Sequence, residues 1–404
     1  MTAADGPGTV PAGCRAAVAV VLGTRPGIVK LAPVLHALAA AQVPHFAIHS
    51  GQHYSANMDQ VFFTDLDLPA PAYRVGDRRP GMLQGEQTAE MLAGIERVLA
   101  RERPALVLVG GDANTNLAGA LAARKLGLVV GHVEAGLRSR DWRMPEEHNR
   151  VMIDHISDIL FAPSRHAKRT AEAEGVRGRV LVTGSTVGAA LRSSLARGDA
   201  ADRAADPRQA DHSGQANCSG QAHGDLPARD PAGYALVTLH RAENVDDPVV
   251  LAELCAGVCS LPGKLGLPLT WPLHPRTRAR LTEFGLLGDV AGAAGVTLIE
   301  PAGHRAFTRL LADAALVVTD SGGIQQEACI LRVPCVTERT STEWTETVEA
   351  GANLVAGVTA AGLIDACLTM IAAPHDWDDP FESDGVPAAQ RIAAVAAEVL
   401  GAAG

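Results

Sequence analysis

In the stretch 110–150, acidic side chains follow two apolar runs, residues 105–109 and residues 128–130. Asp112 comes just after the first run and Glu134 just after the second, while Glu146 stands in the loop or helix start that follows. If the two runs form neighbouring parallel strands, their carboxyl ends bring these acids to one crevice. Several carboxylates facing one crevice suit proton transfer. A structural interpretation competes, because Glu146 after Pro145 also suits a helix start and Asp112 also suits a turn.

Glycines and basic residues after the first apolar run are suited to hold a phosphate group. Residues 16–22 have the continuous apolar character of a buried parallel strand, and the loop 23–27 then leads into a helix expected over residues 28–41. Arg25 and Lys30, together with the backbone N–H groups of a helix start, favour an anion. The alternative is a tight strand-to-helix turn with solvated basic residues.

A second anion-binding pattern lies in the C-terminal half of the chain. Ser321, Gly322 and Gly323 follow an apolar run and open a helix, so a hydroxyl and two unhindered amides are available for a pyrophosphate. Glu327, one turn later, is placed to accept hydrogen bonds from a ribose diol. A Gly-rich helix start that packs closely on the sheet is the structural alternative, and Asp320 ahead of it suits an ordinary N-cap.

His240 and Arg241 follow the apolar segment 234–239 and offer one switchable and one permanent cation. Facing residues 321–323, they would neutralise a leaving diphosphate. His240 taken alone is more often a hydrogen-bonded structural histidine. Its position at a strand end is what favours a functional role.

Strand-like and helix-like segments alternate along the chain in two halves, which predicts an α/β fold with two Rossmann-like, doubly wound domains and a ligand crevice between them. The last strand is expected at residues 334–337 and the last helix at residues 388–400. The expected divisions are a disordered tail 1–14, an N-terminal domain 15–195, a polar insertion or linker 196–230, a C-terminal domain 231–378 and a final segment 379–404.

Composition narrows the class of protein. A formal net charge of −10 argues against a general nucleic-acid surface. The seven cysteines are scattered without a Cys-x-x-Cys pair, which indicates a reduced, cytoplasmic protein. No uninterrupted apolar run approaches a membrane span, and residues 1–13 lack the features of a signal peptide, so we expect no membrane partner.

Taken together, these motifs resemble the non-hydrolysing UDP-N-acetylglucosamine 2-epimerase family, over nearly the whole chain outside the tail and the insertion. The motifs lie in one order, at residues 23–30, 111–112, 132–138, 145–150, 240–244 and 320–325. The resemblance implies a glycosyltransferase-B-type fold, with a deep cleft and a C-terminal helix that returns to the first domain. It also implies interconversion of UDP-GlcNAc and UDP-ManNAc, usually by a homodimer, and we expect neither a cofactor nor a metal.

The family's route eliminates UDP across C1–C2 to give 2-acetamidoglucal and then adds UDP back, with the proton delivered to the other face. Such a route needs acid/base groups near C2 and C3 and a site that retains the diphosphate. By resemblance, the catalytic groups are Asp112, Glu134, Glu146 and His240. Glu327 matches the ribose-binding glutamate and Phe307 the residue beside the uracil. The remaining UDP-sugar-binding positions are Arg25, Lys30, Arg138, Arg150, His240, Arg241, Ser321, Gly322 and Gly323.

Several positions depart from the family pattern. Gly27 and Gln326 each stand where Glu is common, Ala113 stands where Thr follows the Asp, and Trp344 stands where many members have Arg. A branch acting on UDP-2,3-diacetamido-glucuronic acid also carries Trp there and shares the spacing before Glu146, so the sugar stays open. The alternatives are a hydrolysing relative that releases UDP and free ManNAc, a glycosyltransferase that needs an acceptor, and a non-catalytic nucleotide-binding protein.

Overall fold

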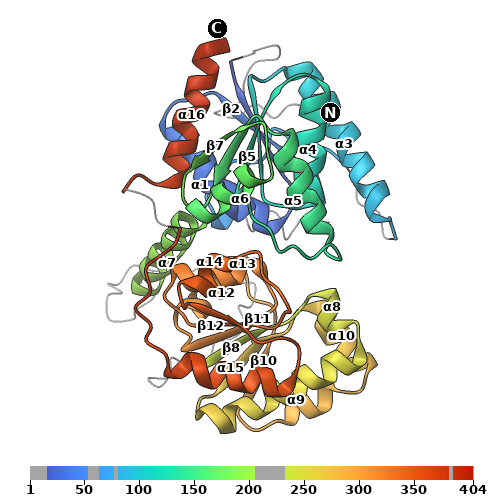
Figure 1. Ribbon diagram of the computed structural model, residues 1–404, viewed down its shortest axis with the longest axis vertical. Helices are drawn as coiled ribbons and strands as arrows, with labels where there is room; N and C mark the ends of the chain where they lie inside the picture. The colour runs from blue at the N-terminus through green and yellow to red at the C-terminus, as the bar shows by residue number, and fades with distance from the viewer. Residues whose placement is uncertain (1–15, 53–62, 77–80, 205–232, 382–384, 404) are drawn as a thin grey trace, which may run out of the picture. The chain divides into compact units, whose positions relative to one another are not determined.

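Two compact α/β units make up the chain in the computed structural model (Figure 1). Unit 1 consists of Met1–Ala190 together with Pro380–Gly404, and unit 2 of Leu191–Asp379. The expected tail and most of the expected insertion lie outside the described residues. The structure describes residues 16–52, 63–76, 81–204, 233–381 and 385–403.

Unit 1 contains a seven-stranded sheet with the order β3-β2-β1-β4-β5-β6-β7, in which every pair of neighbours is parallel. The order reverses between β1 and β4, which is the topological switch point of a doubly wound sheet. Its strands are β1 Val18–Leu22, β2 His45–His49, β3 Tyr73–Arg74, β4 Leu106–Gly110, β5 Val129–Val133, β6 Ile159–Ala162 and β7 Arg179–Val182.

The continuous apolar run of β1 reflects burial on both faces of the sheet. Val18, Val20 and Leu22 face one core, while Ala19 and Val21 face the other. The first core includes residues of α1 and α16, and the second includes residues of α3, α4 and α5. Helices therefore cover both faces, as a parallel sheet requires. The helices of unit 1 are α1 Arg25–Ala40, α3 Gln84–Glu102, α4 Asn114–Lys125, α5 Pro145–Ile156, α6 Arg165–Ala173 and α16 Ala388–Ala403. Helix α7 Val187–Ala204 begins in unit 1, and its residues from Leu191 onward belong to unit 2.

Unit 2 repeats this plan with six strands in the order β10-β9-β8-β11-β12-β13, all parallel, and its switch point lies between β8 and β11. Its strands are β8 Ala235–Thr238, β9 Leu269–Pro272, β10 Val296–Ile299, β11 Leu316–Thr319, β12 Cys335–Thr337 and β13 Asn353–Val355. Its helices are α8 Ala242–Val245, α9 Pro248–Leu265, α10 Pro275–Glu283, α11 Leu287–Gly292, α12 His304–Ala312, α13 Gly322–Ile330, α14 Thr345–Glu349 and α15 Ala360–Ala372.

Helix α9 is the one described helix that is long and apolar enough to cross a membrane by length and composition. One of its faces is buried through Leu251, Leu254, Val258 and Leu261, which belong to the core of unit 2. A core helix passes the same test of length and composition, and this packing identifies α9 as one.

The predicted α/β class and the two doubly wound sheets are confirmed, and α16 packs against α1 within unit 1. Two boundary predictions were wrong. The last strand is β13 rather than residues 334–337, because a three-residue strand starting with Asn353 has almost no apolar run to detect. The insertion does not begin at residue 196, because α7 continues to Ala204 through an Ala-rich sequence that favours a helix.

Candidate functional site

Lys30 and Glu134 form a buried ion pair at the carboxyl end of the unit 1 sheet. Glu134 directly follows β5 and has the left-handed backbone angle φ 70°, which non-glycine residues rarely adopt. Its N–H donates to the carbonyl of Phe161 at 3.0 Å, which holds this turn against β6. Gly111, after β4, faces the same pair, because a Cβ added there would stand 3.1 Å from Lys30 Nζ.

Burial raises the pKa of the Glu134 carboxyl, against the opposing attraction of Lys30. Burial alone would lower the pKa of Lys30, but Glu134 and Asp112 outweigh it, so the pKa of Lys30 lies above its ordinary value and the ammonium stays charged. A carboxyl with a raised pKa beside a fixed cation is equipped to take up and return a proton.

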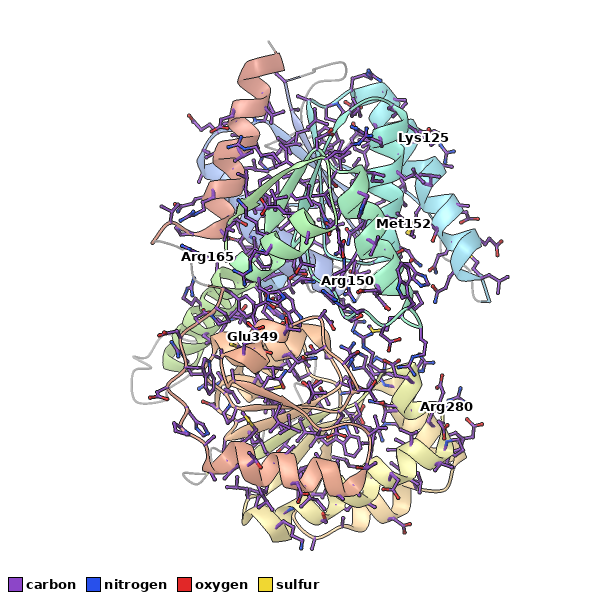
Figure 2. The ribbon with its side chains drawn as sticks, in the orientation of Figure 1. Lys125, Arg150, Met152, Arg165, Arg280 and Glu349 are labelled. Carbon is purple, nitrogen blue, oxygen red and sulfur yellow. The ribbon has the colours of Figure 1, made fainter. Side chains whose placement is uncertain are left out.

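Asp112 is held by α5 from two directions. Arg150, labelled in Figure 2, contacts the Asp112 carboxylate through Nη1, while Asn149 Nδ2 donates to the Asp112 carbonyl at 2.8 Å. The Asp112 side chain keeps 31% of its surface exposed, whereas the Arg150 side chain is buried. Asp112 is therefore fixed in place and still accessible.

Sequence reasoning missed the role of Glu147. This buried carboxylate accepts hydrogen bonds from the N–H of Ser139 at 2.9 Å and of Arg140 at 2.7 Å, and it accepts one from Arg150 Nε at 3.0 Å. It thereby orients the arginine that holds Asp112. The i, i+3 spacing from Glu147 to Arg150 on a helix was the available signal. Glu146, the preceding residue and a predicted acid/base group, lies in the first turn of α5.

Arg138 belongs to a buried network of polar side chains in unit 1. His132 places Nδ1 2.6 Å from Asp154 and Nε2 3.0 Å from the carbonyl of Gly111, and Arg138 pairs with Asp154 and Glu174. Burial alone would raise the pKa of Asp154, but His132 and Arg138 outweigh it and hold that pKa below its usual range. The substrate-binding assignment of Arg138 stays a prediction, and these internal contacts do not favour it.

In unit 2, the buried Asp320 organises the switch point between β8 and β11. It accepts hydrogen bonds from the N–H groups of His240 and Arg241, both at 2.9 Å, and lies 3.1 Å from His240 Nδ1. Although burial alone would raise the pKa of Asp320, the bonds from His240 and from these amides outweigh it and hold that pKa low. The N-cap interpretation of Asp320 was wrong, since Ser321 occupies that position of α13.

Helix α13 begins with the predicted glycines. Gly322 and Gly323 are its first two residues, and Ser321 stands ahead of them without a side-chain cap bond. A Cβ at Gly322 would lie 2.0 Å from Glu343 Oε1, so the Glu343 side chain packs closely against this glycine. The amides of this helix start are the groups that bind anions.

The remaining predicted residues lie near the same strand ends or on neighbouring helices. Arg25 is the first residue of α1, and Arg241 is the N-cap of α8. Glu327 lies in the second turn of α13, and Phe307 on α12 packs against the core beside β11. In unit 1, the carboxyl end of the sheet thus brings together Lys30, Asp112, Glu134 and Arg150. In unit 2, His240, Arg241 and Ser321 lie around Asp320.

Comparisons with known proteins show the family to which the chain belongs. The family model described as UDP-N-acetylglucosamine 2-epimerase matches residues 36–396. The UDP-N-acetylglucosamine 2-epimerase of Methanocaldococcus jannaschii is 42% identical over 365 residues, covering 90% of this chain and 94% of that protein. The UDP-2,3-diacetamido-2,3-dideoxy-D-glucuronate 2-epimerase of Pseudomonas aeruginosa is 38% identical over 374 residues, covering 92% of this chain and 97% of that protein.

Solved structures give the same result. The crystal structure of the Methanocaldococcus jannaschii UDP-GlcNAc 2-epimerase in complex with UDP-GlcNAc and UDP matches with a TM-score of 0.81 and 41% identity, covering 94% of this chain and 99% of that one. The enzyme from Neisseria meningitidis bound to UDP-GlcNAc matches with a TM-score of 0.80 and 27% identity, covering 95% and 99%. The chain has the glycosyltransferase-B-type architecture of these structures and belongs to the UDP-N-acetylglucosamine 2-epimerase family of isomerases.

Proposed function

We propose that the protein interconverts UDP-GlcNAc and UDP-ManNAc, or a close UDP-2-acetamido sugar, without net hydrolysis. A base removes the proton at C2 while UDP leaves C1 with the electron pair of the C1–O bond, in an anti elimination that gives 2-acetamidoglucal. UDP then re-forms the bond to C1 as a proton is delivered to the opposite face of C2. Inversion at C2 therefore needs proton-handling groups for two faces of the sugar.

The observation that carries the proposal is the carboxyl cluster of unit 1. Glu134 is buried beside Lys30 and has a raised pKa, whereas Asp112 is accessible and paired with Arg150. Two carboxyls in such different environments suit two different proton-transfer roles. Asp112, Glu134 and Glu146 are the proposed acid/base groups, and Lys30 is proposed to hold the charge of Glu134 when its proton has left.

Unit 2 supplies the groups that the leaving diphosphate requires. We assign its binding to His240, the hydroxyl of Ser321 and the amides of Gly322 and Gly323, with Arg241 nearby. Asp320 supports this role by fixing the loop that carries His240 and Arg241. An oriented set of N–H donors and a cation stabilises negative charge as it develops on the leaving group.

The test is incubation of the protein with UDP-GlcNAc in D2O, followed by NMR. We expect UDP-ManNAc to accumulate and deuterium to appear at C2 of both sugars. Free UDP accumulating with free ManNAc would replace the proposal with the hydrolysing alternative. Turnover that appears only with an added acceptor would indicate a glycosyltransferase, and UDP binding with no deuterium at C2 would indicate a non-catalytic binder.

A UDP-2,3-diacetamido-glucuronic acid is the second candidate substrate. The supporting observation is Trp344, which is buried and whose Nε1 would lie 3.6 Å from a Cβ added to Gly322 at the start of α13. The relative from Pseudomonas aeruginosa, named for that substrate, adds to this support. A panel of UDP-sugars differing at C3 and C6, with deuterium incorporation at C2 as the readout, distinguishes the two.

We also propose that the protein is a homodimer, on the resemblance to its family. The chain has a mass of 41.9 kDa. Light scattering after size exclusion should give twice this mass, and a mass equal to that of one chain would reject the dimer.

A further inference from the structure

Three buried carboxyl groups crowd the carboxyl end of the unit 2 sheet: Asp320 after β11, Glu338 after β12, and Glu343 beyond it. Thr319 pairs with Thr337 in register, and the N–H of Glu338 donates to the carbonyl of Thr319 at 2.9 Å. Residues at the same level of neighbouring parallel strands point to the same face of the sheet. Asp320 and Glu338 are therefore side-by-side acids.

Two of these carboxyl groups have a basic partner. Asp320 has His240, together with the backbone amides described above, and Glu343 accepts from Arg339 Nη1 at 2.8 Å. Burial of such pairs is tolerable because each charge is matched.

Glu338 is different. It is fully buried, and within the described part of the chain neither Oε1 nor Oε2 has a hydrogen-bond partner. Asn244, which reaches it from α8, donates to its backbone carbonyl at 2.8 Å and to Asp320 Oδ2 at 3.3 Å, so the amide group joins the two strand ends without neutralising the carboxyl.

The titratable groups around Glu338 would not neutralise the negative charge of an ionised Glu338 carboxylate. Asp320 faces it from β11, and Cys367 faces it from α15. His240, from the end of β8, is already occupied by Asp320, and Arg339 is occupied by Glu343. Burial, and secondarily the charge of Asp320, raise the pKa of Glu338 to about 8.

The location gives this carboxyl a consequence for ligand binding. Residues 321–323, the proposed diphosphate cradle, continue directly from Asp320. A charged Glu338 would add an uncompensated negative charge beside an anion site in a low-dielectric interior, where like charges repel strongly.

We propose that Glu338 is a positioning residue that must keep its proton for unit 2 to hold a diphosphate, and that its ionisation weakens nucleotide binding. The proposal rests on the proposed UDP-binding function of residues 321–323. In its neutral form Glu338 leaves Asp320 as the carboxylate that His240 contacts, so the imidazole stays directed by Asp320.

The test is calorimetric titration of UDP into the full-length protein between pH 7 and pH 9.5. For the wild type we expect affinity to fall above pH 8, by up to about tenfold per pH unit for a single linked proton. Titration in buffers of different ionisation enthalpy should show uptake of a proton on binding near pH 8.5. Because this measurement needs no variant, it remains informative if a substitution prevents folding.

Glu338→Gln fixes the neutral form, so the variant should keep its affinity at pH 9 and take up no proton. Asp365→Asn, which removes an exposed acid on α15, is the matched control and should behave as wild type. Equal pH dependence in wild type and Glu338→Gln, or no proton uptake by the wild type, would overturn the inference.

These outcomes are separable from failure of the proposed function. Pronounced proton-linked UDP binding without deuterium exchange at C2 would reject the epimerase reaction and retain the role of Glu338. Absence of UDP binding by the wild type at pH 7 would reject both.

Discussion

Acidic residues in this protein differ chiefly in what surrounds them. Glu134 is buried beside a lysine and has a raised pKa, Asp154 is buried beside a histidine and an arginine and has a lowered one, and Asp112 is partly exposed with an arginine partner. The environment of Glu134 favours its protonated form, and the environment of Asp154 favours its ionised form. We therefore propose proton exchange for Glu134 and Asp112 and a structural role for Asp154.

Asp112→Asn is expected to lower kcat for epimerisation by about 10²–10⁴-fold, the range typical of a lost acid/base group. The amide preserves the shape of the side chain but cannot take up a proton, so UDP affinity should change little. Deuterium incorporation at C2 and calorimetric UDP binding measure the two effects. Glu172→Gln, at an exposed position on α6, is the control; near-normal turnover of Asp112→Asn would remove this residue from proton transfer.

Burial of Glu338 should also make the free energy of unfolding depend on pH. The pKa of Glu338 is raised in the folded state from 4.5 to about 8. The contribution of this group to the free energy of unfolding is therefore fully present below pH 4.5 and is lost as pH rises through 8. Glu338→Gln should therefore gain stability relative to wild type between pH 5 and pH 8, by at most about 1.4 kcal/mol per pH unit.

Denaturant unfolding followed by tryptophan fluorescence measures this effect in unit 2. Trp271, Trp344 and Trp377 are buried there, whereas Trp142 of unit 1 is exposed. A difference between variant and wild type that stays constant with pH would show that Glu338 does not titrate in this range.

At the scale of elements, chemistry sits in the turns that follow strands. The sequence predicted these turns because strands buried on both faces are continuous apolar runs, so Asp112, Glu134 and His240 could be placed at strand ends in advance. Sequence could not reveal what each side chain would contact. The Arg150–Asp112 and Lys30–Glu134 pairs join segments 38 and 104 residues apart, and such separations leave no local pattern.

Glu338 escaped prediction for a related reason. It is an acid at the end of a three-residue strand, and its importance depends on the neighbouring strand and on the lack of a basic partner within the described residues. Glu327 and Phe307 lie on helices of unit 2, but their roles beside ribose and uracil stay predictions. The cytoplasmic location and the dimer also stay predictions.

The turn after β5 offers a test of local geometry. Gly136 has φ 85°, and a Cβ there would lie 2.2 Å from the backbone carbonyl oxygen of Ala167. Gly175 has φ 75°, yet no atom lies within 4 Å of its added Cβ. Both alanine variants bear the cost of a left-handed backbone, about 1–2 kcal/mol, but only Gly136→Ala adds a backbone clash.

We expect Gly136→Ala to be destabilised by several kcal/mol more than Gly175→Ala, or to fail to fold, as measured by urea unfolding with far-UV circular dichroism. Gly175→Ala is the matched control, because it bears the cost of the left-handed backbone without the clash. Equal stability of the two variants would show that the α6 segment moves aside at little cost.

At the scale of the whole molecule, unit 1 is built from two separated parts of the chain. The chain leaves unit 1 after Ala190 and returns at Pro380, and α16 then contributes Ala389, Ile392 and Ala396 to the core around β1 and α1. Figure 1 draws α16, in red, beside α1. The stability of the first unit therefore depends on the last helix.

Ile392→Ala should destabilise unit 1 by about 2–5 kcal/mol, because the side chain is fully buried and its loss leaves a cavity. The unfolding of unit 2, followed by the buried tryptophans, should change little. Gln390→Ala, at an exposed position of the same helix, is the control. An effect of Ile392→Ala confined to unit 2 would contradict the assignment of α16 to unit 1.

This division has a consequence for the newly made protein. Proteins are synthesised from the N-terminus, and domains generally fold as units while the chain emerges. The first half of the protein leaves the ribosome long before α16 exists, so the groove that Ile392 fills stays open during translation of all of unit 2. We therefore expect a chain that ends at Asp379, once released from the ribosome, to contain a finished second unit and an unfinished first one.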